Sequence, residues 1–361
     1  MRCHDEILQP SRFFLLSETA AYRAPFWLPG GHLQTIYAKL APAPRVIYRR
    51  ERWDTPDGDF IDLDWLAGGA DEPLVVLFHG LEGGSNGHYA RSMMAAVQQR
   101  SWRGVVVHFR GCSGEANLLP RFYHSGDAAE IDWVLRRIKA NQRGMPLFVT
   151  GVSLGGNALL KWLAQERDHA QAVIDAAAAV SAPVDLHAAG EALGRGFNQI
   201  YTRHFLQTLR RKSLRKLEDH PGLYDADAVS RARTLREFDN LVTAPLHGYK
   251  DTDDYWMRAS SKPGLVDIHV PTLLVNAKND PFLPAEYLPA ASEVSAYVTR
   301  EFPATGGHVG FVSGRFPGHL MWLPQRLLRF FDAKRHPPRM PFDSARSGML
   351  SSTPSQSGIA R

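Results

Sequence analysis

Short apolar runs alternate with amphipathic stretches along most of this chain. Residues 74–78 read LVVLF, and residues 105–109 and 147–150 are similar runs, as expected of strands that are buried on both faces of a sheet. Helical spacing of apolar side chains fills the segments between and after them, at residues 88–99, 127–139 and 154–165. Strands that alternate with helices in this way predict a mostly parallel sheet with helices on both faces.

Further segments complete a predicted sheet of eight strands. They lie at residues 46–53, 60–66, 172–180, 272–275 and 296–302. The first two are joined by a turn at residues 55–58, whose Thr-Pro-Asp-Gly sequence favours chain reversal. The Ala-rich run at 172–180 suits either a strand or a helix, and its position in the alternation favours a strand.

One stretch breaks the alternation and predicts an insertion into the core. Residues 183–262 are polar and helical, without a clear strand pattern. We expect them to form a helical lid over the C-terminal edge of the sheet. The core is then made of residues 1–182 and 263–335. It ends in a helix over residues 316–331, and Pro324 within this range leaves the first residue of the helix undetermined. Residues 336–361 are rich in Pro, Ser, Gly and Arg, which predicts a disordered tail.

A serine motif lies at the junction of a predicted strand and a predicted helix. Gly151-Val152-Ser153-Leu154-Gly155 follows the strand at 147–150 and opens the helix at 154–165, which is the context of a G-x-S-x-G nucleophile elbow. The tight turn would raise the hydroxyl of Ser153 to the top of the sheet, and the glycines would prevent clashes with neighbouring elements. The alternative is a Gly-rich turn in which Ser153 is an ordinary helix N-cap.

A base and an acid are expected after this serine, because the fold orders its triad as serine, acid and then histidine. Asp280 follows the strand at 272–275, and His308 follows the strand at 296–302 within a Gly-rich loop. Imidazole titrates near neutral pH and can take the serine proton, while a carboxylate fixes its tautomer. Asp280 could instead belong to a strand-end turn, and His308 could be structural, as one of 15 histidines.

Two backbone N–H groups are candidates for an oxyanion hole. One belongs to Leu154, directly after the serine, and the other to Leu81, in the loop His79-Gly80-Leu81-Glu82-Gly83-Gly84. The N-terminus of the helix that begins at Leu154 also favours negative charge at this place. We expect His79 to brace the loop rather than to act as a second base.

Composition narrows the remaining possibilities. The formal net charge of +5 over 361 residues is too mild to indicate nucleic-acid binding. With only two cysteines and no N-terminal apolar run of signal-peptide length, we expect no disulfide, no signal peptide and a cytoplasmic location. No apolar run approaches the roughly 18 residues of a membrane span.

Cofactors and partners are constrained by the motifs that the chain lacks. It contains no H-E-x-x-H, C-x-x-C or P-loop sequence, so we predict neither a metal nor a nucleotide cofactor. The basic run at residues 210–216 is compatible with transient contact with an anionic membrane surface, but a solvated helix face is the simpler interpretation. The expected partner is a small-molecule ester or a lipid substrate.

With these residues in place, the chain resembles the AB hydrolase 4 family, the YheT-type branch of the α/β-hydrolases, from about residue 20 to residue 335. The similar motifs are Pro29-Gly30-Gly31-His32-Leu33-Gln34-Thr35, the 79–83 loop, residues 109–114, residues 121–126, the elbow at 151–157, Phe238-Asp239 and residues 255–260. His108-Phe109 stands where that family has Asn before Arg110, and Val152 stands where it often has Phe.

The resemblance implies an α/β-hydrolase fold and hydrolysis of carboxylic esters, either short acyl esters or glycerolipid-type esters. The triad would then be Ser153, Asp280 and His308. Two alternatives stay open from the sequence. The same triad could serve an acyltransferase, thioesterase or amidase, or the fold could have been retained by a non-catalytic ligand-binding protein.

Overall fold

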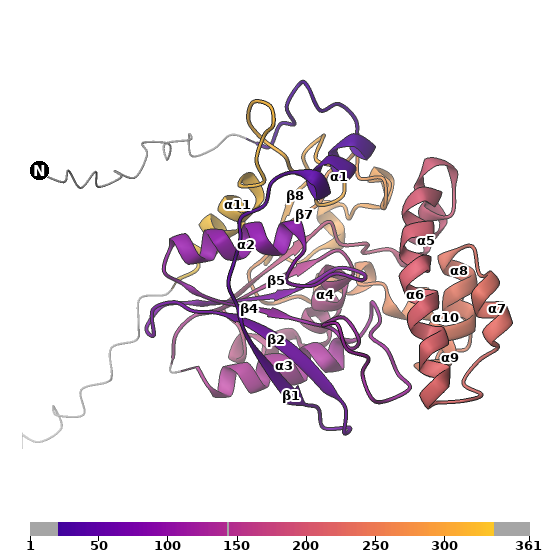
Figure 1. Cartoon of the computed structure of the whole chain (residues 1–361). Helices are drawn as coiled ribbons and strands as arrows, with labels where there is room; N and C mark the ends of the chain where they lie inside the picture. The colour runs from indigo at the N-terminus through magenta and orange to yellow at the C-terminus, as the bar shows by residue number, and fades with distance from the viewer. Residues whose placement is uncertain (1–20, 143, 336–361) are drawn as a thin grey trace, which may run out of the picture.

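An eight-stranded sheet forms the centre of the computed structural model, which describes residues 21–142 and 144–335 (Figure 1). The strands are β1 (Arg49–Asp54), β2 (Phe60–Leu66), β3 (Leu74–Phe78), β4 (Arg103–Val107), β5 (Leu147–Val152), β6 (Ala176–Val180), β7 (Thr272–Val275) and β8 (Val298–Glu301), in the order β1-β2-β4-β3-β5-β6-β7-β8. The pairs β1–β2 and β2–β4 are antiparallel and the others are parallel. The predicted mostly parallel, eight-stranded fold is therefore confirmed.

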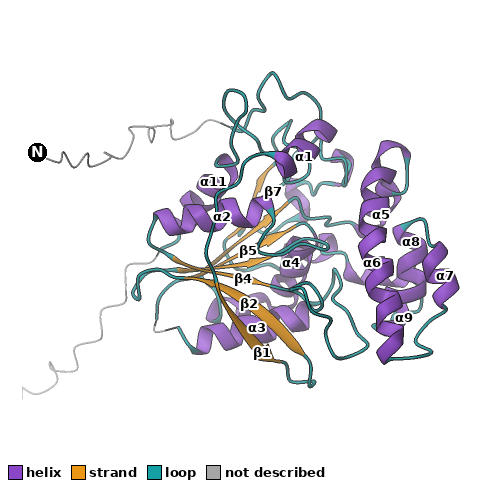
Figure 2. Ribbon diagram, in the orientation of Figure 1, coloured by secondary structure: helices purple, strands orange, loops and turns teal. Residues whose placement is uncertain are grey.

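Helices cover both faces of the sheet (Figure 2). Helices α2 (His88–Gln99) and α11 (Trp322–Asp332) pack on one face, and α3 (Ala128–Ala140) and α4 (Leu154–Glu166) pack on the other. Strand β3 is apolar throughout because both of its faces are buried. Leu74, Val76 and Phe78 belong to the core under α3 and α4, whereas Val75 and Leu77 belong to the core under α2 and α11.

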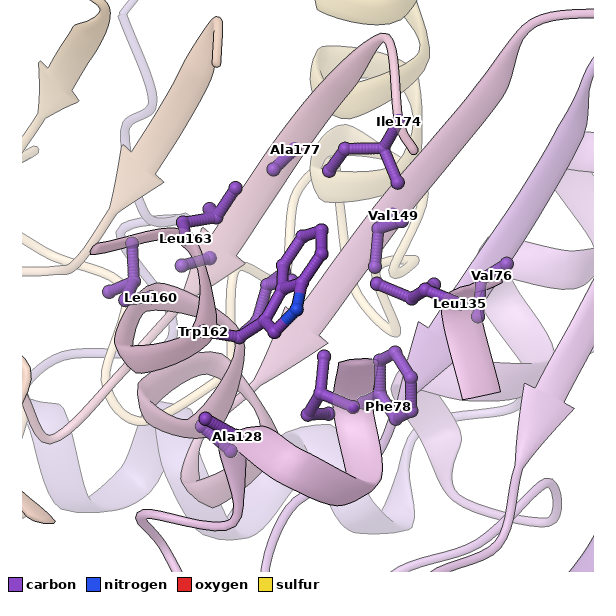
Figure 3. Close-up of a cluster of buried hydrophobic side chains, with 14 of the residues drawn as sticks. Val76, Phe78, Ala128, Leu135, Val149, Leu160, Trp162, Leu163, Ile174 and Ala177 are labelled. Atoms are coloured by element: carbon purple, nitrogen blue, oxygen red, sulfur yellow. The ribbon is translucent and has the colours of Figure 1, made fainter. Parts of the chain in front are cut away.

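Trp162 on α4 is the largest fully buried side chain of the α3–α4 layer (Figure 3). It lies among Leu135 of α3, Val149 of β5 and Ala177 of β6. Its Nε1–H donates a hydrogen bond to Asp132 Oδ1 at 2.9 Å, so burial leaves no polar atom of the indole unpaired. This packing fixes α4, and with it the turn that precedes the helix.

The chain between β6 and β7 is helical, and we call residues 183–262 the insertion. Its helices are α5 (Leu186–Leu193), α6 (Gln199–Asp219), α7 (Ala226–Arg231), α8 (Leu235–Phe238), α9 (Ala244–Leu246) and α10 (Thr252–Ala259). They gather on one side of the molecule, on the right in Figure 1. Leu206, Val229, Phe238 and Val242 form a small apolar core within the insertion, apart from the two cores of the sheet.

Some boundaries differ from those expected. Strand β6 begins only at Ala176, because residues Arg167–Ala172 form a 3-10 helix. Helix α11 begins at Trp322 rather than at residue 316, because Ser313 and His319 pair as an antiparallel bridge in the preceding segment. Pro324 falls in the first turn of the helix, where a missing N–H breaks no intrahelical hydrogen bond.

The N-terminal segment up to residue 20 and the predicted tail at 336–361 lie outside the described residues. None of the described helices is both long and apolar enough to cross a bilayer.

Candidate active site

Ser153 sits on the tight turn between β5 and α4. Its backbone angles, φ 53° and ψ −121°, are unusual for a residue with a side chain. A Cβ on Gly151 would lie 2.4 Å from the carbonyl oxygen of Gly155, and a Cβ on Gly155 would lie 2.5 Å from that of His79. Only glycine fits at these two positions, so the G-x-S-x-G pattern follows from the close packing of strand and helix.

The hydroxyl of Ser153 does not cap the helix that follows it. Ser153 occupies the N-cap position of α4, but its side chain makes no capping hydrogen bond. Instead Ser153 Oγ lies 3.0 Å from His308 Nε2. Ser153 is therefore not an ordinary capping residue, because its side chain contacts His308 and not the helix.

Ser153, His308 and Asp280 form one chain of hydrogen bonds, although they follow three different strands. His308 Nδ1 lies 2.9 Å and 3.1 Å from the two carboxylate oxygens of Asp280. The Nδ1–H thus donates to the carboxylate, which leaves Nε2 free to accept the proton of Ser153 Oγ. The side chains of His308 and Asp280 are only 10% and 1% exposed, which shields both contacts from water.

Phe282 completes the surroundings of this pair. Its ring stacks on the imidazole of His308 with ring centres 3.9 Å apart, and its N–H donates to Asp280 Oδ1 at 2.8 Å. One residue therefore orients both the base and the acid. Nothing in the sequence around Phe282 pointed to it, because the stacking partner lies in another loop.

The 79–84 loop passes so close to Ser153 at Gly80 that a side chain there would be crowded. A Cβ on Gly80 would lie 3.0 Å from Ser153 Cβ, and Leu81 and Leu154 both line the pocket that contains Ser153. His79 braces the loop: its Nδ1–H donates to the carbonyl of Gly80 at 2.7 Å, and its Nε2 accepts the N–H of Phe109 at 3.1 Å. Burial lowers the pKa of His79 to about 3, so the ring stays neutral.

A largely apolar pocket opens at Ser153 and extends beneath the insertion. Its empty volume is about 1060 Å³, part of which is open to solvent. The insertion contributes the apolar side chains of Leu186, Leu193, Phe205, Leu209, Leu235 and Val242. A substrate bound at Ser153 would therefore contact the insertion as well as the sheet.

Charged groups also reach this pocket. Lys212 of α6 forms an ion pair with Glu82 of the 79–84 loop at 2.8 Å, and the hydroxyl of Tyr123 donates to the same carboxylate at 2.9 Å. Asp239 accepts hydrogen bonds from the hydroxyl of Thr243 and from Trp256 Nε1–H. Burial among these neutral donors raises the pKa of Asp239 to about 6.

The basic run at residues 210–216 is largely occupied by contacts within the protein. Of its five cations, Arg210 donates to the carbonyl of Ser230, Lys212 pairs with Glu82, and Lys216 donates to carbonyls at Asn117 and Leu119. Arg211 and Arg215 are left exposed. In the part of the chain that the structure describes, no three side chains of His, Cys, Asp or Glu gather as a metal site.

The first turn of helix α1 (Gly31–Leu40) contacts the loops that carry Asp280 and His308. Gln34 and Thr35 make these contacts through hydrogen bonds to loop residues, and Gln34 makes none to the side chain of Asp280 or of His308. The sequence had marked this segment only as a family motif. Its partners are more than 200 residues away in the chain, so no local pattern could reveal the contact.

Comparisons with known proteins show the family and the fold of this chain. The model of the alpha/beta hydrolase fold family matches residues 73–314. YheT of Escherichia coli (strain K12), a candidate esterase by its name, is 40% identical over 82% of this chain and 88% of its own length. Phospholipase ABHD3 of Mus musculus is 30% identical over 87% of this chain and 79% of its own length.

A solved structure shows the same fold. Est1E from Butyrivibrio proteoclasticus, solved with ferulic acid bound, superposes with a TM-score of 0.52 at 16% identity, over 79% of this chain and 98% of that chain.

Proposed function

The chain belongs to the AB hydrolase 4 family of the α/β-hydrolase fold, and from that premise we propose that it cleaves carboxylic esters through an acyl-enzyme on Ser153. Its relatives include esterases, phospholipases and lipases, so the chain is a hydrolase of the esterase and lipase type. One observation carries the finer proposal. The hydrogen bonds from Asp280 through His308 to Ser153 end at the wall of an apolar pocket.

In the acylation step, Ser153 Oγ attacks the carbonyl carbon of the ester while His308 Nε2 takes the hydroxyl proton. The carboxylate of Asp280 stabilises the imidazolium that forms. His308 then returns the proton to the oxygen of the leaving alcohol as the carbon–oxygen bond breaks. The N–H groups of Leu81 and Leu154 hold the oxyanion, and each such donor typically contributes about 10²–10³ in turnover.

In the deacylation step, water takes the place of the alcohol. His308 removes a proton from the water as its oxygen attacks the acyl carbon, and it then returns the proton to Ser153 Oγ. The carboxylic acid leaves and the free serine is restored. No cofactor is needed, because each proton moves between groups that this chain, the substrate or the attacking water supplies.

The proposed substrates are short acyl esters or glycerolipid-type esters. The apolar lining supports an acyl chain in the pocket, and the insertion supplies much of that lining, which suits a lid over a lipid substrate. Two relatives act on lipids by their names, a phospholipase and a monoacylglycerol lipase of Saccharomyces cerevisiae that is 28% identical over 78% of this chain.

Labelling with a fluorophosphonate probe tests the nucleophile. We expect wild type to be labelled and Ser153→Ala not to be. Ser125→Ala is the matched control, since Ser125 lines the same pocket and its Oγ accepts a hydrogen bond from Asn157 rather than contacting His308. Failure of folded wild type to react, with the pocket open to the probe, would contradict the proposal and favour a ligand-binding protein.

A substrate panel tests the reaction type. It pairs p-nitrophenyl esters of increasing chain length with a thioester and an anilide of the same acyl group, and it includes a monoacylglycerol. Faster cleavage of the esters supports the proposal. A preference for the thioester or anilide, or transfer of the acyl group to an added alcohol in place of hydrolysis, would assign the same triad to another activity.

A further inference from the structure

Four consecutive backbone N–H groups in the loop of His308 donate to side-chain oxygens instead of to a regular ladder. The donors and acceptors are Gly306 to Gln34 Oε1 (2.8 Å), Gly307 to Asn279 Oδ1 (3.0 Å), His308 to Thr35 Oγ1 (2.8 Å) and Val309 to Ser181 Oγ (3.1 Å). The loop also contains three residues with positive φ, at Gly306, Gly307 and Val309. Because these N–H groups have no partners within the loop, its conformation depends on acceptor side chains from other segments.

Gln34 joins this loop to the loop of Asp280. Its Oε1 accepts from Gly306 N–H and also from Asn279 Nδ2 at 3.0 Å, and its Nε2 donates to the carbonyl of Leu28 at 2.9 Å. Asn279 directly precedes Asp280 and holds Gly307 through its own Oδ1. Gln34 is only 1% exposed, so water does not compete for these bonds.

Thr35 holds the backbone of His308 itself. Its hydroxyl donates to the carbonyl of Gly31, one turn earlier in α1, at 2.7 Å. The same oxygen is thereby oriented to accept the N–H of His308. Thr35 is 4% exposed.

Backbone packing brings α1 within reach of both loops. A Cβ on Gly31 would lie 1.9 Å from the carbonyl oxygen of Asn279, and a Cβ on Gly307 would lie 2.6 Å from the carbonyl oxygen of Gly31. Side chains at these positions would push the helix and the loops apart. The Gly-Gly-His-Leu-Gln-Thr sequence therefore combines a glycine for close approach with two hydrogen-bonding residues.

We propose that Gln34 and Thr35 are positioning residues that set the distance between Asp280 and His308 and aim the imidazole at Ser153. The role rests on the proposed function, since it concerns the same three residues. Neither residue contacts the reacting atoms. They act through His308, whose ring must lie within hydrogen-bond distance of two partners at once. A displacement of about 1 Å in such a site can reduce turnover about 100-fold.

The test is a pair of substitutions at Thr35. Thr35→Val keeps the shape and removes the oxygen, whereas Thr35→Ser keeps the oxygen and removes the methyl group. For Thr35→Val we expect kcat on a p-nitrophenyl ester and the rate of fluorophosphonate labelling to fall about 10–100-fold, with KM nearly unchanged. Thr35→Ser should restore most of the loss. Thr299→Val, the same change at an exposed site on β8, is the matched control.

Nuclear magnetic resonance supplies a readout that needs no turnover. The Nδ1 proton of His308 in its bond to Asp280 should give a downfield resonance in wild type and in Thr35→Ser. In Thr35→Val this resonance should shift or broaden through exchange with water. If Thr35→Val does not fold, Gln34→Met removes the other acceptor and is judged by the same measurements.

The outcomes separate this proposal from the proposed function. Equal kcat, labelling rate and resonance in Thr35→Val and wild type would overturn it, as would a Thr35→Ser variant as impaired as Thr35→Val. Loss of thermal stability alone, with unchanged kcat for the folded protein, would also overturn it. If wild type shows the resonance and Thr35→Val loses it, but neither is labelled, the positioning role stands and ester hydrolysis fails.

Discussion

Replacing Asp239 with Asn should make the stability of this protein less sensitive to pH. The carboxylate of Asp239 accepts hydrogen bonds from Thr243 and Trp256, and both donors are neutral. An Asn side chain can keep both contacts, because its oxygen can accept from Trp256 Nε1–H and its amide can donate to the hydroxyl of Thr243. The substitution therefore removes a charge and little else.

The magnitude follows from the pKa of Asp239. Burial raises this pKa from an ordinary 3.8 to about 6, so the folded protein holds its proton to higher pH than the unfolded chain does. Unfolding releases that proton between these two values, and the free energy of unfolding falls as pH rises from about 4 to about 7. A difference of about two pKa units corresponds to about 3 kcal/mol at pH 8. This is an upper bound, because Asp239 partly faces the pocket.

Urea unfolding at intervals from pH 4 to pH 8 measures the effect. The stability of Asp239→Asn relative to wild type should rise over this range by up to about 3 kcal/mol. Asp227→Asn, which changes an exposed carboxylate on α7, should show no such trend. A stability difference between Asp239→Asn and wild type that is constant with pH would refute the reasoning, and so would one that falls as pH rises.

Three further predictions concern the site and the core. Asp280→Asn should reduce kcat about 10⁴-fold with the fold intact by circular dichroism, because an amide does not stabilise the imidazolium of His308; a loss below tenfold would count against the triad. Gly155→Ala should lower the free energy of unfolding by about 1–3 kcal/mol and slow fluorophosphonate labelling, since its Cβ would lie 2.5 Å from a backbone oxygen. Gly194→Ala is the control, where the nearest atoms lie at 3.5 Å, and equal effects of the two substitutions would exclude the steric explanation. Trp162→Ala should cost about 3–5 kcal/mol by thermal or urea unfolding, and a cost below 1 kcal/mol would show that this core does not hold α4.

Much of the fold could be read from local patterns. The run LVVLF of β3 predicted a strand with two buried faces, and its alternate residues do enter two separate cores. The glycines around Ser153 predicted a tight turn between strand and helix, and the clash distances give the reason. Such features depend on neighbours within a few residues, so the sequence displays them directly.

The partners of Ser153 were predicted by a rule of order rather than by a local pattern. Asp280 and His308 follow late strands, and parallel strands bring their carboxyl ends to one edge of the sheet. The distances of 2.9 Å and 3.0 Å between these side chains come only from the structure. The sequence also did not predict that the ring of Phe282 stacks on His308 or that Glu82 pairs with Lys212. Each contact joins two segments that are distant in the sequence.

The sequence by itself determined the eight strands, the tight turn at Ser153 and the family. It also determined the order of serine, acid and histidine along the chain. Only the tertiary structure decided what holds the loops of Asp280 and His308, because Thr35 and His308 are 273 residues apart. Local periodicity reports which face of an element is buried, but it does not report which distant segment covers that face. A hydrogen bond between such segments exists only after the sheet has brought them together.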